Sequence, residues 1–273
     1  MKALAELVRA PAALTVFGDT AAGAAAAGRP LSGRRLLLPV ASVAFYWAGM
    51  ALNDWADRRL DAVERPERPI PSGRVRPGTA LGVASGLTAA GLGLAGFAEG
   101  RRALRVAVPL AGAVWAYDTW LKRTPAGPFG MAACRVLDVL LGGAGAPAAA
   151  AIGVHTLGVT ALSGGEVHGG SPATARAAAL GTAIAGGLAV RRGSGLVAAA
   201  LGAGYAASVG GPQLRAAREP SGGRIRRATA AGIHGMLPLQ ASIAARHGSV
   251  RTAAVLTAVL PCARRLGKRV SPT

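Results

Sequence analysis

The sequence predicts an all-α protein, a multi-span transmembrane helical bundle of about nine or ten helices. Three observations lead to this fold class: apolar residues make up 51% of the 273 positions, charged residues only 16%, and the charges lie in short clusters between apolar runs. A helix needs about 20 mostly apolar residues to cross a bilayer, and fewer where the bilayer is thin. We therefore expect one integral membrane domain, residues 1–273.

Ten apolar runs are candidate spans. Several are short and rich in Ala and Gly, and small residues four apart, such as Gly82 and Gly86, allow membrane helices to approach closely. The alternative is a soluble Ala/Gly-rich helical protein, which would have to bury all of these faces with few large side chains. In chain order the candidate spans are 11–28, 36–52, 79–98, 103–121, 128–145, 147–163, 173–190, 194–211, 228–245 and 249–263.

The formal net charge of +19 is explained better by membrane orientation than by nucleic-acid binding, and we expect no nucleic-acid partner. The basic residues are scattered over many loops and are not gathered on one face. Cytoplasmic loops carry an excess of Lys and Arg. With a cytoplasmic N-terminus and ten spans, 20 of the 31 basic residues lie inside, and we expect the motif loops on the cytoplasmic side of a bacterial inner membrane. Arg135 lies within a span, and the outer residues are Arg29, Arg34, Arg35, Arg101, Arg102, Arg105, Arg191, Arg192, Arg246 and Arg251.

The first apolar stretch and the two cysteines exclude some simpler interpretations. The stretch runs on towards Gly28, so it indicates a first span and not a cleavable signal peptide. Cys134 and Cys262 have no paired spacing, so they predict neither a disulfide framework nor a metal-binding knuckle.

The most informative stretch begins where the second candidate span ends. Asn53, Asp57 and Asp61 recur every four residues, so a continuing helix places them along one stripe, with Asp54 beside it. Carboxylates so close together repel one another unless a cation joins them, and Mg²⁺ prefers such oxygen ligands. A solvated loop, with the acids paired to neighbouring arginines, is the alternative. Because ionisable groups at the mouth of a span are costly and tend to be functional, we favour a Mg²⁺ site formed by these four residues.

The same stretch carries a family resemblance. N-D-x-x-D-x-x-x-D at residues 53–61, followed by R-P-I-P-S-G at 68–73, resembles the first aspartate-rich motif of the UbiA superfamily of membrane prenyltransferases. The rest of the chain looks closest to the EboC-like branch of that superfamily. The resemblance implies a helical bundle around a central cavity, with an isoprenoid diphosphate bound through Mg²⁺ and its tail leaving into lipid. It also implies that Asp54, Asp57 and Asp61 are catalytic and that Asn53 and Arg68 help to bind the substrate.

Two further groups are candidates for substrate binding. Tyr117 and Lys122 resemble the tyrosine and lysine that follow the fourth span in this superfamily, where the basic residue faces the diphosphate and acts as a point-charge ligand. Lys122 and Arg123 are alternatively an ordinary cytoplasmic anchor pair. Arg135 and Asp138 lie three residues apart in an apolar run, close enough to pair. Charged groups inside a span face a cavity or one another, so this pair is either a structural salt bridge or a substrate contact.

One part of the chain departs from the superfamily pattern. The superfamily has a second aspartate-rich motif at the end of about the sixth span, but residues 155–168 contain no D-x-x-x-D, and Glu166 is their only acid. His168 is either an opportunistic ligand beside Glu166 or a solvated loop residue, whereas His155 is expected to be buried and hydrogen-bonded. The missing motif puts a two-metal arrangement in doubt.

Seven of the 11 aromatic residues flank the two candidate clusters. An interfacial aromatic belt would place Trp and Tyr at this depth. Alternatively, the rings face the cavity and stabilise an allylic cation formed when the donor ionises, by about 0.5–2 kcal/mol each. Both readings remain open for Phe45, Tyr46, Trp47, Trp55, Trp115, Tyr117 and Trp120.

Together these features predict a Mg²⁺-dependent membrane prenyltransferase that moves an isoprenoid group from a prenyl diphosphate to an acceptor. The four oxygen-bearing residues would hold the metal, while Arg68 and Lys122 offset the remaining negative charge. The acceptor and the prenyl chain length cannot be read from these residues. The alternative is a non-catalytic UbiA-like membrane protein that binds or moves a lipid-like metabolite precursor.

Overall fold

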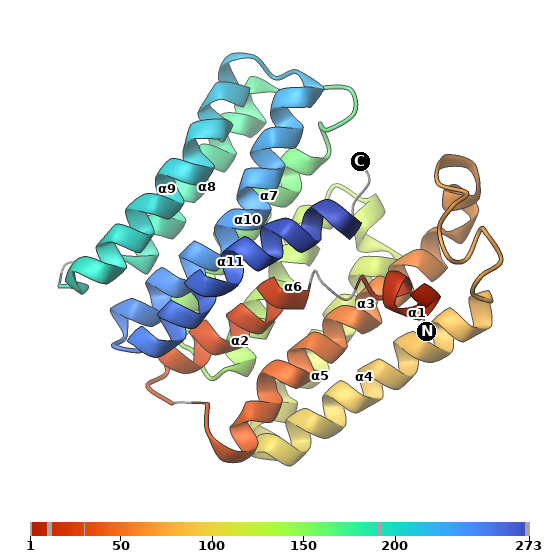
Figure 1. Cartoon of the computed structure of the whole chain (residues 1–273), viewed down its shortest axis with the longest axis horizontal. Coiled ribbons are helices and arrows are strands. Elements are labelled where there is room, and N and C mark those ends of the chain that lie inside the picture. The colour runs from red at the N-terminus through yellow and green to blue at the C-terminus, as the bar shows by residue number, and fades with distance from the viewer. Residues whose placement is uncertain (1, 10–12, 30, 191–192, 271–273) are drawn as a thin grey trace.

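The computed structural model is a helical bundle that contains no strand in the part of the chain it describes (Figure 1). The described residues are 2–9, 13–29, 31–190 and 193–270, without the side chains of Lys2, Leu14 and residues 262–270. The predicted all-α class is confirmed. The α-helices are α1 (Lys2–Leu7), α2 (Leu14–Ala26), α3 (Leu37–Glu64), α4 (Pro77–Glu99), α5 (Arg101–Thr119), α6 (Gly127–Leu141), α7 (Ala146–Ser163), α8 (Pro172–Ala189), α9 (Gly195–Arg218), α10 (Gly222–Arg246) and α11 (Val250–Val270); two short 3-10 helices are η2 (Gly33–Leu36) and η3 (Leu121–Arg123).

The ten predicted spans correspond to α2–α11. The described part of the chain has one further α-helix, the short α1. By length and composition alone, three of the described helical segments are long and apolar enough to cross a membrane: residues 33–64, which join η2 to α3, then α4 and α7. The sequence predictions also concern Arg191, Arg192, Cys262 and four basic residues between 264 and 269, whose side chains lie outside the described part of the chain.

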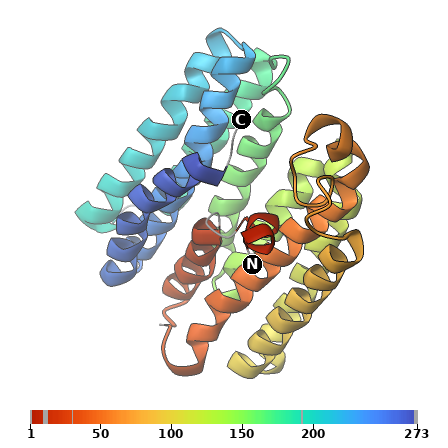
Figure 2. The ribbon, with the colours of Figure 1, turned by 45° about the vertical axis from the view of Figure 1, so that its right-hand side comes forward.

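The helices are arranged so that consecutive ones pack against each other as antiparallel neighbours. Figures 1 and 2 show α3, α4 and α5 on one side of the bundle and α8 and α9 on the other. Between them, α2 packs against α3, α6 and α10, and α10 also packs against α7. The first half of the chain is thus joined to the second half by direct helix contacts. The odd-numbered helices from α3 onwards end at the same end of the bundle at which the even-numbered helices from α4 onwards begin.

Close approach of helices depends on glycine at particular positions. A Cβ atom added at Gly142 in the turn after α6 would lie 2.3 Å from the backbone oxygen of Thr20 in α2, and one at Gly23 would lie 2.1 Å from that of Val139. Small residues at such crossings let membrane helices pack backbone to backbone. Gly82 and Gly86 do not serve this purpose, because a Cβ at either would meet nothing within 4 Å. The expectation of close packing at those two glycines is wrong, because that face of α4 meets no other helix.

The shape of α3 positions the candidate site. Its apolar part ends near Leu52, yet the helix continues for about three turns to Glu64 and carries the acidic residues out of the apolar part of the bundle. It ends at Glu64 because the next residue, Arg65, precedes Pro66, and a residue before proline disfavours the helical conformation. A connecting segment containing Arg68 then folds back, and Pro77 starts α4 at a position where its missing N–H costs nothing.

Candidate functional site

The last turns of α3 present their acidic residues on two neighbouring faces. At about 100° per residue, Asp57 lies about 40° around the helix from Asn53, whereas Asp61 and Asp54 lie about 80° and 100° away. Asn53 and Asp57 accordingly contact the end of α5 and η3, while Asp54 and Asp61 contact Arg68 of the connecting segment. The expected single stripe is therefore divided into two pairs with different basic or polar partners.

Asp57 is held by the two basic residues that follow α5. Its Oδ2 lies 2.7 Å from Lys122 Nζ, and its Oδ1 lies 2.7 Å from Arg123 Nη2. Hydrogen bonds from two cationic side chains favour the ionised form of this carboxylate. The acid is thus kept ionised beyond Leu52, where the apolar part of α3 has ended. Lys122 thus reaches the acidic motif.

Asp54 and Asp61 share one arginine. Arg68 Nη1 lies 2.7 Å from Asp61 Oδ2 and 3.5 Å from Asp54 Oδ1, and both acids are buried, with 3% exposed. A second arginine, Arg9, donates to Asp54 Oδ1 at 3.2 Å. Sequence reasoning missed Arg9, because a lone basic residue just before a first span looks the same as an ordinary interfacial anchor.

A cavity of about 100 Å³ lies beside these residues, between α2, α3, α5 and α6. Phe45, Tyr46 and Tyr117 line it, together with Asp118. Its position agrees with the central cavity that the resemblance implied, and three of the seven singled-out aromatics face it. Sequence reasoning missed Asp118, which is 3% exposed and accepts a hydrogen bond from the side chain of Asn53.

The tryptophans of the same group are placed elsewhere. Trp115 Nε1 donates to Thr88 Oγ1 of α4 at 3.0 Å, and Trp120 is 67% exposed. Trp55 packs under Arg58, whose Cζ lies 4.8 Å from the ring centroid. Of the two alternatives left open for these aromatics, Tyr117 faces the cavity, whereas Trp115 contacts α4. Residues two positions apart lie about 200° apart around a helix, so Trp115 faces a different neighbour from Tyr117.

Arg135 and Asp138 both line the cavity, and each contacts a partner on another helix, so the salt bridge between them, one of the two alternatives, is not what the structure shows. Arg135 Nε lies 2.8 Å from Asp19 Oδ2 of α2, and Asp138 Oδ2 accepts a hydrogen bond of 2.7 Å from Ser42 Oγ of α3. Gln240 of α10 donates to Asp19 Oδ1 at 2.7 Å. These groups tie four helices together inside the bundle. Asp19 was missed by sequence reasoning, although one acid inside an apolar span is the signal that marks it.

The second half of the bundle supplies no matching acidic cluster. Glu166 lies between α7 and α8, where its backbone oxygen accepts from Arg226, and His168 is exposed. His155 is buried as expected: one ring nitrogen lies 3.1 Å from the Gly232 carbonyl and the other 2.8 Å from the Tyr205 hydroxyl. Since the carbonyl can only accept, Nε2 carries the proton and Nδ1 accepts from Tyr205.

The donor chemistry at the end of α3 suits Mg²⁺, because three carboxylates and one amide oxygen are hard ligands. Their present geometry does not gather them: within the described residues, no group of three His, Cys, Asp or Glu side chains is close enough to hold one ion. Arg68 bridges Asp54 and Asp61, whereas Lys122 and Arg123 pair with Asp57. Metal binding would therefore require the carboxylates to exchange these basic partners for the ion.

These observations define a class of protein, a helical membrane bundle with acidic and basic side chains facing one another at one end of a central cavity. The chain belongs to the UbiA prenyltransferase family, whose model matches residues 14–164, more than half of its length. It is an integral membrane protein.

Two curated relatives and two solved structures show how far the similarity extends. The chain is 40% identical over 130 residues to the digeranylgeranylglyceryl phosphate synthase of Methanopyrus kandleri, which is 46% of each chain. It is also 40% identical over 85 residues to the synthase of the same name from Methanospirillum hungatei, covering 29% of this chain and 28% of the relative. It thus spans less than half the length of the curated relatives it matches.

The structural similarity covers nearly the whole chain. A structure described as "Structural and mechanistic insights into the biosynthesis of Digeranylgeranylglyceryl phosphate synthase in membranes" superposes with a TM-score of 0.70 at 18% identity, over 92% of this chain and 98% of the other. The apo structure of a UbiA homolog from Aeropyrum pernix K1 superposes with a TM-score of 0.64 at 16% identity, over 85% of this chain and 96% of the other. At these identities the likeness establishes the fold alone.

Proposed function

We propose that this protein is a Mg²⁺-dependent membrane prenyltransferase that moves an isoprenoid group from a prenyl diphosphate to an acceptor. One observation carries the proposal: at the end of α3, Asp54, Asp57 and Asp61 are faced by Arg68 and Lys122, beside a cavity lined by aromatic rings. Oxygen ligands for a cation and basic side chains for a phosphate are the two halves of a metal–diphosphate site.

The proposed roles follow from the present contacts. Asn53, Asp54, Asp57 and Asp61 would hold Mg²⁺, which when bound neutralises charge on the leaving diphosphate. Arg68 and Lys122 now neutralise carboxylates. Once the carboxylates have another counter-ion, the same basic side chains are released to face phosphate oxygens. Arg9 also pairs with Asp54 and adds a further positive charge to the site.

The cavity side chains would act on the prenyl end of the donor. Phe45, Tyr46 and Tyr117 present rings to the cavity, and a ring face stabilises a cation by about 0.5–2 kcal/mol. The curated relatives are named for a digeranylgeranylglyceryl phosphate product, so a prenylated glyceryl phosphate is the first acceptor to test. We propose Arg135 and Asp138, which line the deeper part of the same cavity, as groups that shape the space for the prenyl end and acceptor.

We further propose that residues 1–273 form one such domain in a bacterial inner membrane, with the acidic end of α3 in the cytoplasm. The excess of basic residues at that end of the helices supports this orientation. The EboC-like branch stays a prediction from the sequence, since the relatives described above carry a different name.

The test is release of pyrophosphate from a panel of prenyl diphosphates by purified protein, with and without Mg²⁺. Geranyl, farnesyl and geranylgeranyl diphosphate would each be offered with and without geranylgeranylglyceryl phosphate. Release that requires both Mg²⁺ and an acceptor is the expected result. The absence of release under every condition, from protein that binds the donor, would exclude the prenyltransferase.

The lone Glu166 favours a second candidate function, a non-catalytic UbiA-like protein that binds or moves a lipid-like precursor. Only one acid lies in the segment where the superfamily has its second aspartate-rich motif. Such a protein would bind prenyl diphosphates but release no pyrophosphate, so the same assay together with a binding measurement separates the two functions.

A further inference from the structure

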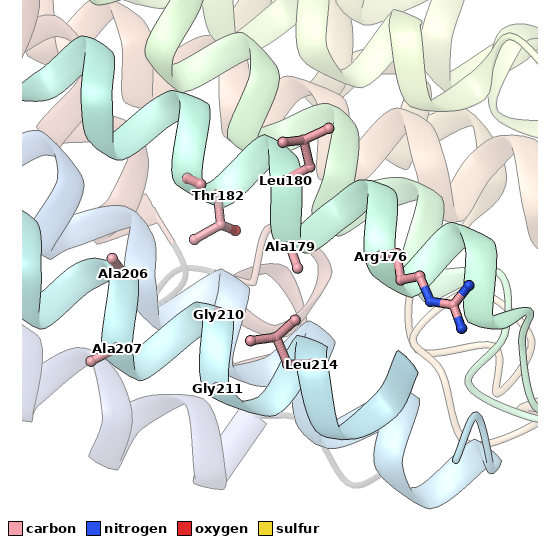
Figure 3. A pocket seen from close by; sticks show the side chains of 10 residues that line it. Arg176, Ala179, Leu180, Thr182, Ala206, Ala207, Gly210, Gly211 and Leu214 are labelled. Carbon is pink, nitrogen blue, oxygen red and sulfur yellow. The ribbon is translucent and has the colours of Figure 1, made fainter. Parts of the chain in front are cut away.

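A groove of about 570 Å³ lies between α8 and α9. These two helices lie on the other side of the bundle from α3, α4 and α5 (Figures 1 and 2). Its floor consists of alanine and glycine from both helices, and Leu180 and Leu214 form its walls (Figure 3). Leu180 is 62% exposed and Leu214 54% exposed. In an integral membrane protein, such an exposed apolar face lies against lipid chains, so hydrocarbon and not water fills the groove.

Two arginines stand at one end of this groove. Arg176 lines it, at the end opposite Ala206 and Ala207 (Figure 3). Arg215 Nη1 comes within 3.6 Å of the position of a Cβ atom built on the lining residue Gly211. Both arginines lie near the start of α8 and the end of α9, which is the end of the bundle where α3 also ends. The groove therefore joins an apolar channel to a concentrated positive charge at one membrane surface.

These two guanidinium groups lack acidic partners within the described part of the chain. The nearest acid along α9, Glu219, pairs with Arg224 of α10, with 2.6 Å between Oε2 and Nη2. Arg9, Arg68 and Arg74, at the same end of the bundle, each pair with an acid instead. A basic pocket between membrane helices, beside an apolar channel, is the arrangement that binds anionic lipid head groups.

We propose that the groove between α8 and α9 binds one anionic phospholipid of the bilayer. Its phosphate lies between Arg176 and Arg215, and one acyl chain runs along Ala179, Ala183 and Gly210. The lining runs from Arg176 to Ala183 of α8, which is about 10 Å, so the groove holds the part of the chain next to the head group. This site is separate from the prenyl diphosphate site and does not depend on the catalytic function proposed above.

The first experiment compares two lipids that differ only in head-group charge. Delipidated wild type in detergent is titrated with dioleoylphosphatidylglycerol or dioleoylphosphatidylcholine, and bound lipid is counted by native mass spectrometry. Because each basic residue near the surface contributes about a fivefold preference, we expect about 25-fold tighter binding of one phosphatidylglycerol. Arg176→Gln should reduce the preference to about fivefold, and Arg176→Gln with Arg215→Gln should abolish it. Arg227→Gln, the same change at an exposed arginine of α10, should leave it unaltered.

The second experiment fills the channel. Gly211→Leu places a side chain where a Cβ meets only the end of Arg215, so it should weaken binding of both lipids without disturbing the backbone. Gly93→Leu makes the same change in α4, where a Cβ meets nothing within 4 Å, and should change neither. Three results would overturn the proposal: equal binding of the two lipids by wild type, displacement of the phosphatidylglycerol by farnesyl diphosphate, or a dimer that Gly211→Leu converts to monomer, which would assign the groove to a second copy.

Discussion

The side-chain amide of Asn53 donates a hydrogen bond to the carboxylate of Asp118, with 3.1 Å between Nδ2 and Oδ1. An amide has one oxygen and one nitrogen end, so fixing the nitrogen on an acceptor also fixes where the oxygen points. The carboxylate of Asp118 packs closely against Gly49, since a Cβ at Gly49 would lie 3.0 Å from Asp118 Oδ2. The α5 carboxylate thus orients the α3 amide that we propose as a metal ligand.

Replacing Asp118 should therefore weaken metal binding without removing any proposed ligand. For Asp118→Ala we expect a loss of about 10–100-fold in Mn²⁺ affinity, measured by electron paramagnetic resonance with Mn²⁺ in place of Mg²⁺, because outer partners of metal ligands contribute that much. Asp118→Asn keeps an oxygen that can accept from Asn53 and should lose less. Met131→Leu, an apolar change in the same cavity, serves as the control. Unchanged Mn²⁺ affinity in Asp118→Ala would show that the contact has no role in orienting Asn53.

Tyr117 and Trp115 lie two residues apart but face different surroundings. Tyr117 lines the cavity, whereas Trp115 donates to Thr88 of α4. Tyr117→Leu should lower the rate of pyrophosphate release by about twofold to 30-fold, the range that follows from losing about 0.5–2 kcal/mol of cation stabilisation. Trp115→Leu should instead lower the melting temperature and leave the rate per folded molecule near that of wild type. The reverse pattern would assign Trp115, and not Tyr117, to the reacting group.

Much of the fold could be predicted from the sequence, because apolar runs determine where the membrane helices lie. Each predicted span overlaps one of the helices α2–α11, and the continuation of α3 beyond its apolar part was inferred from the spacing of Asn53 and Asp57. That spacing correctly brings these two residues to the same side, next to α5 and η3.

The partners of the site residues could not be predicted in the same way. Arg9 and Asp54 are 45 positions apart, and Asn53 and Asp118 are 65 apart. Helical periodicity orders neighbours within one helix, but it does not determine which helix lies opposite. For this reason a pair between Arg135 and the local Asp138 was one of two alternatives from the sequence, whereas the bundle places Asp19 of α2 against Arg135.

A second ion-pair cluster, at the opposite end of the bundle, should contribute to stability and not to function. Glu99 of α4 pairs with both Arg29 and Arg35, and Arg35 also donates to the Gly142 carbonyl at 3.0 Å. Glu99→Gln removes the charged acceptor that Arg29 and Arg35 share, and hydrogen bonds to charged groups contribute about 1.5–3 kcal/mol. We expect the melting temperature in detergent to fall by about 3–10 °C. Glu64→Gln, at the exposed end of α3, is the control, and an equal effect of the two changes would contradict this role.

The strongest test of the proposed metal site is Asp57→Asn. The change keeps the shape of the side chain but removes the charge that now faces Lys122 and Arg123, so two basic groups lose their partner and stability should fall slightly. Mg²⁺-dependent binding of a prenyl thiolodiphosphate should weaken, because a hard cation prefers charged oxygen. The rate of transfer should fall by about 10²–10³, as when one donor is removed from a charge-stabilising site. Glu166→Gln makes the comparison: it should be mild if α7 and α8 contribute no metal ligand, and nearly as severe if Glu166 serves as one. Equal binding by wild type and both variants, independent of Mg²⁺, would mean that the end of α3 is a charged helix end with structural ion pairs only.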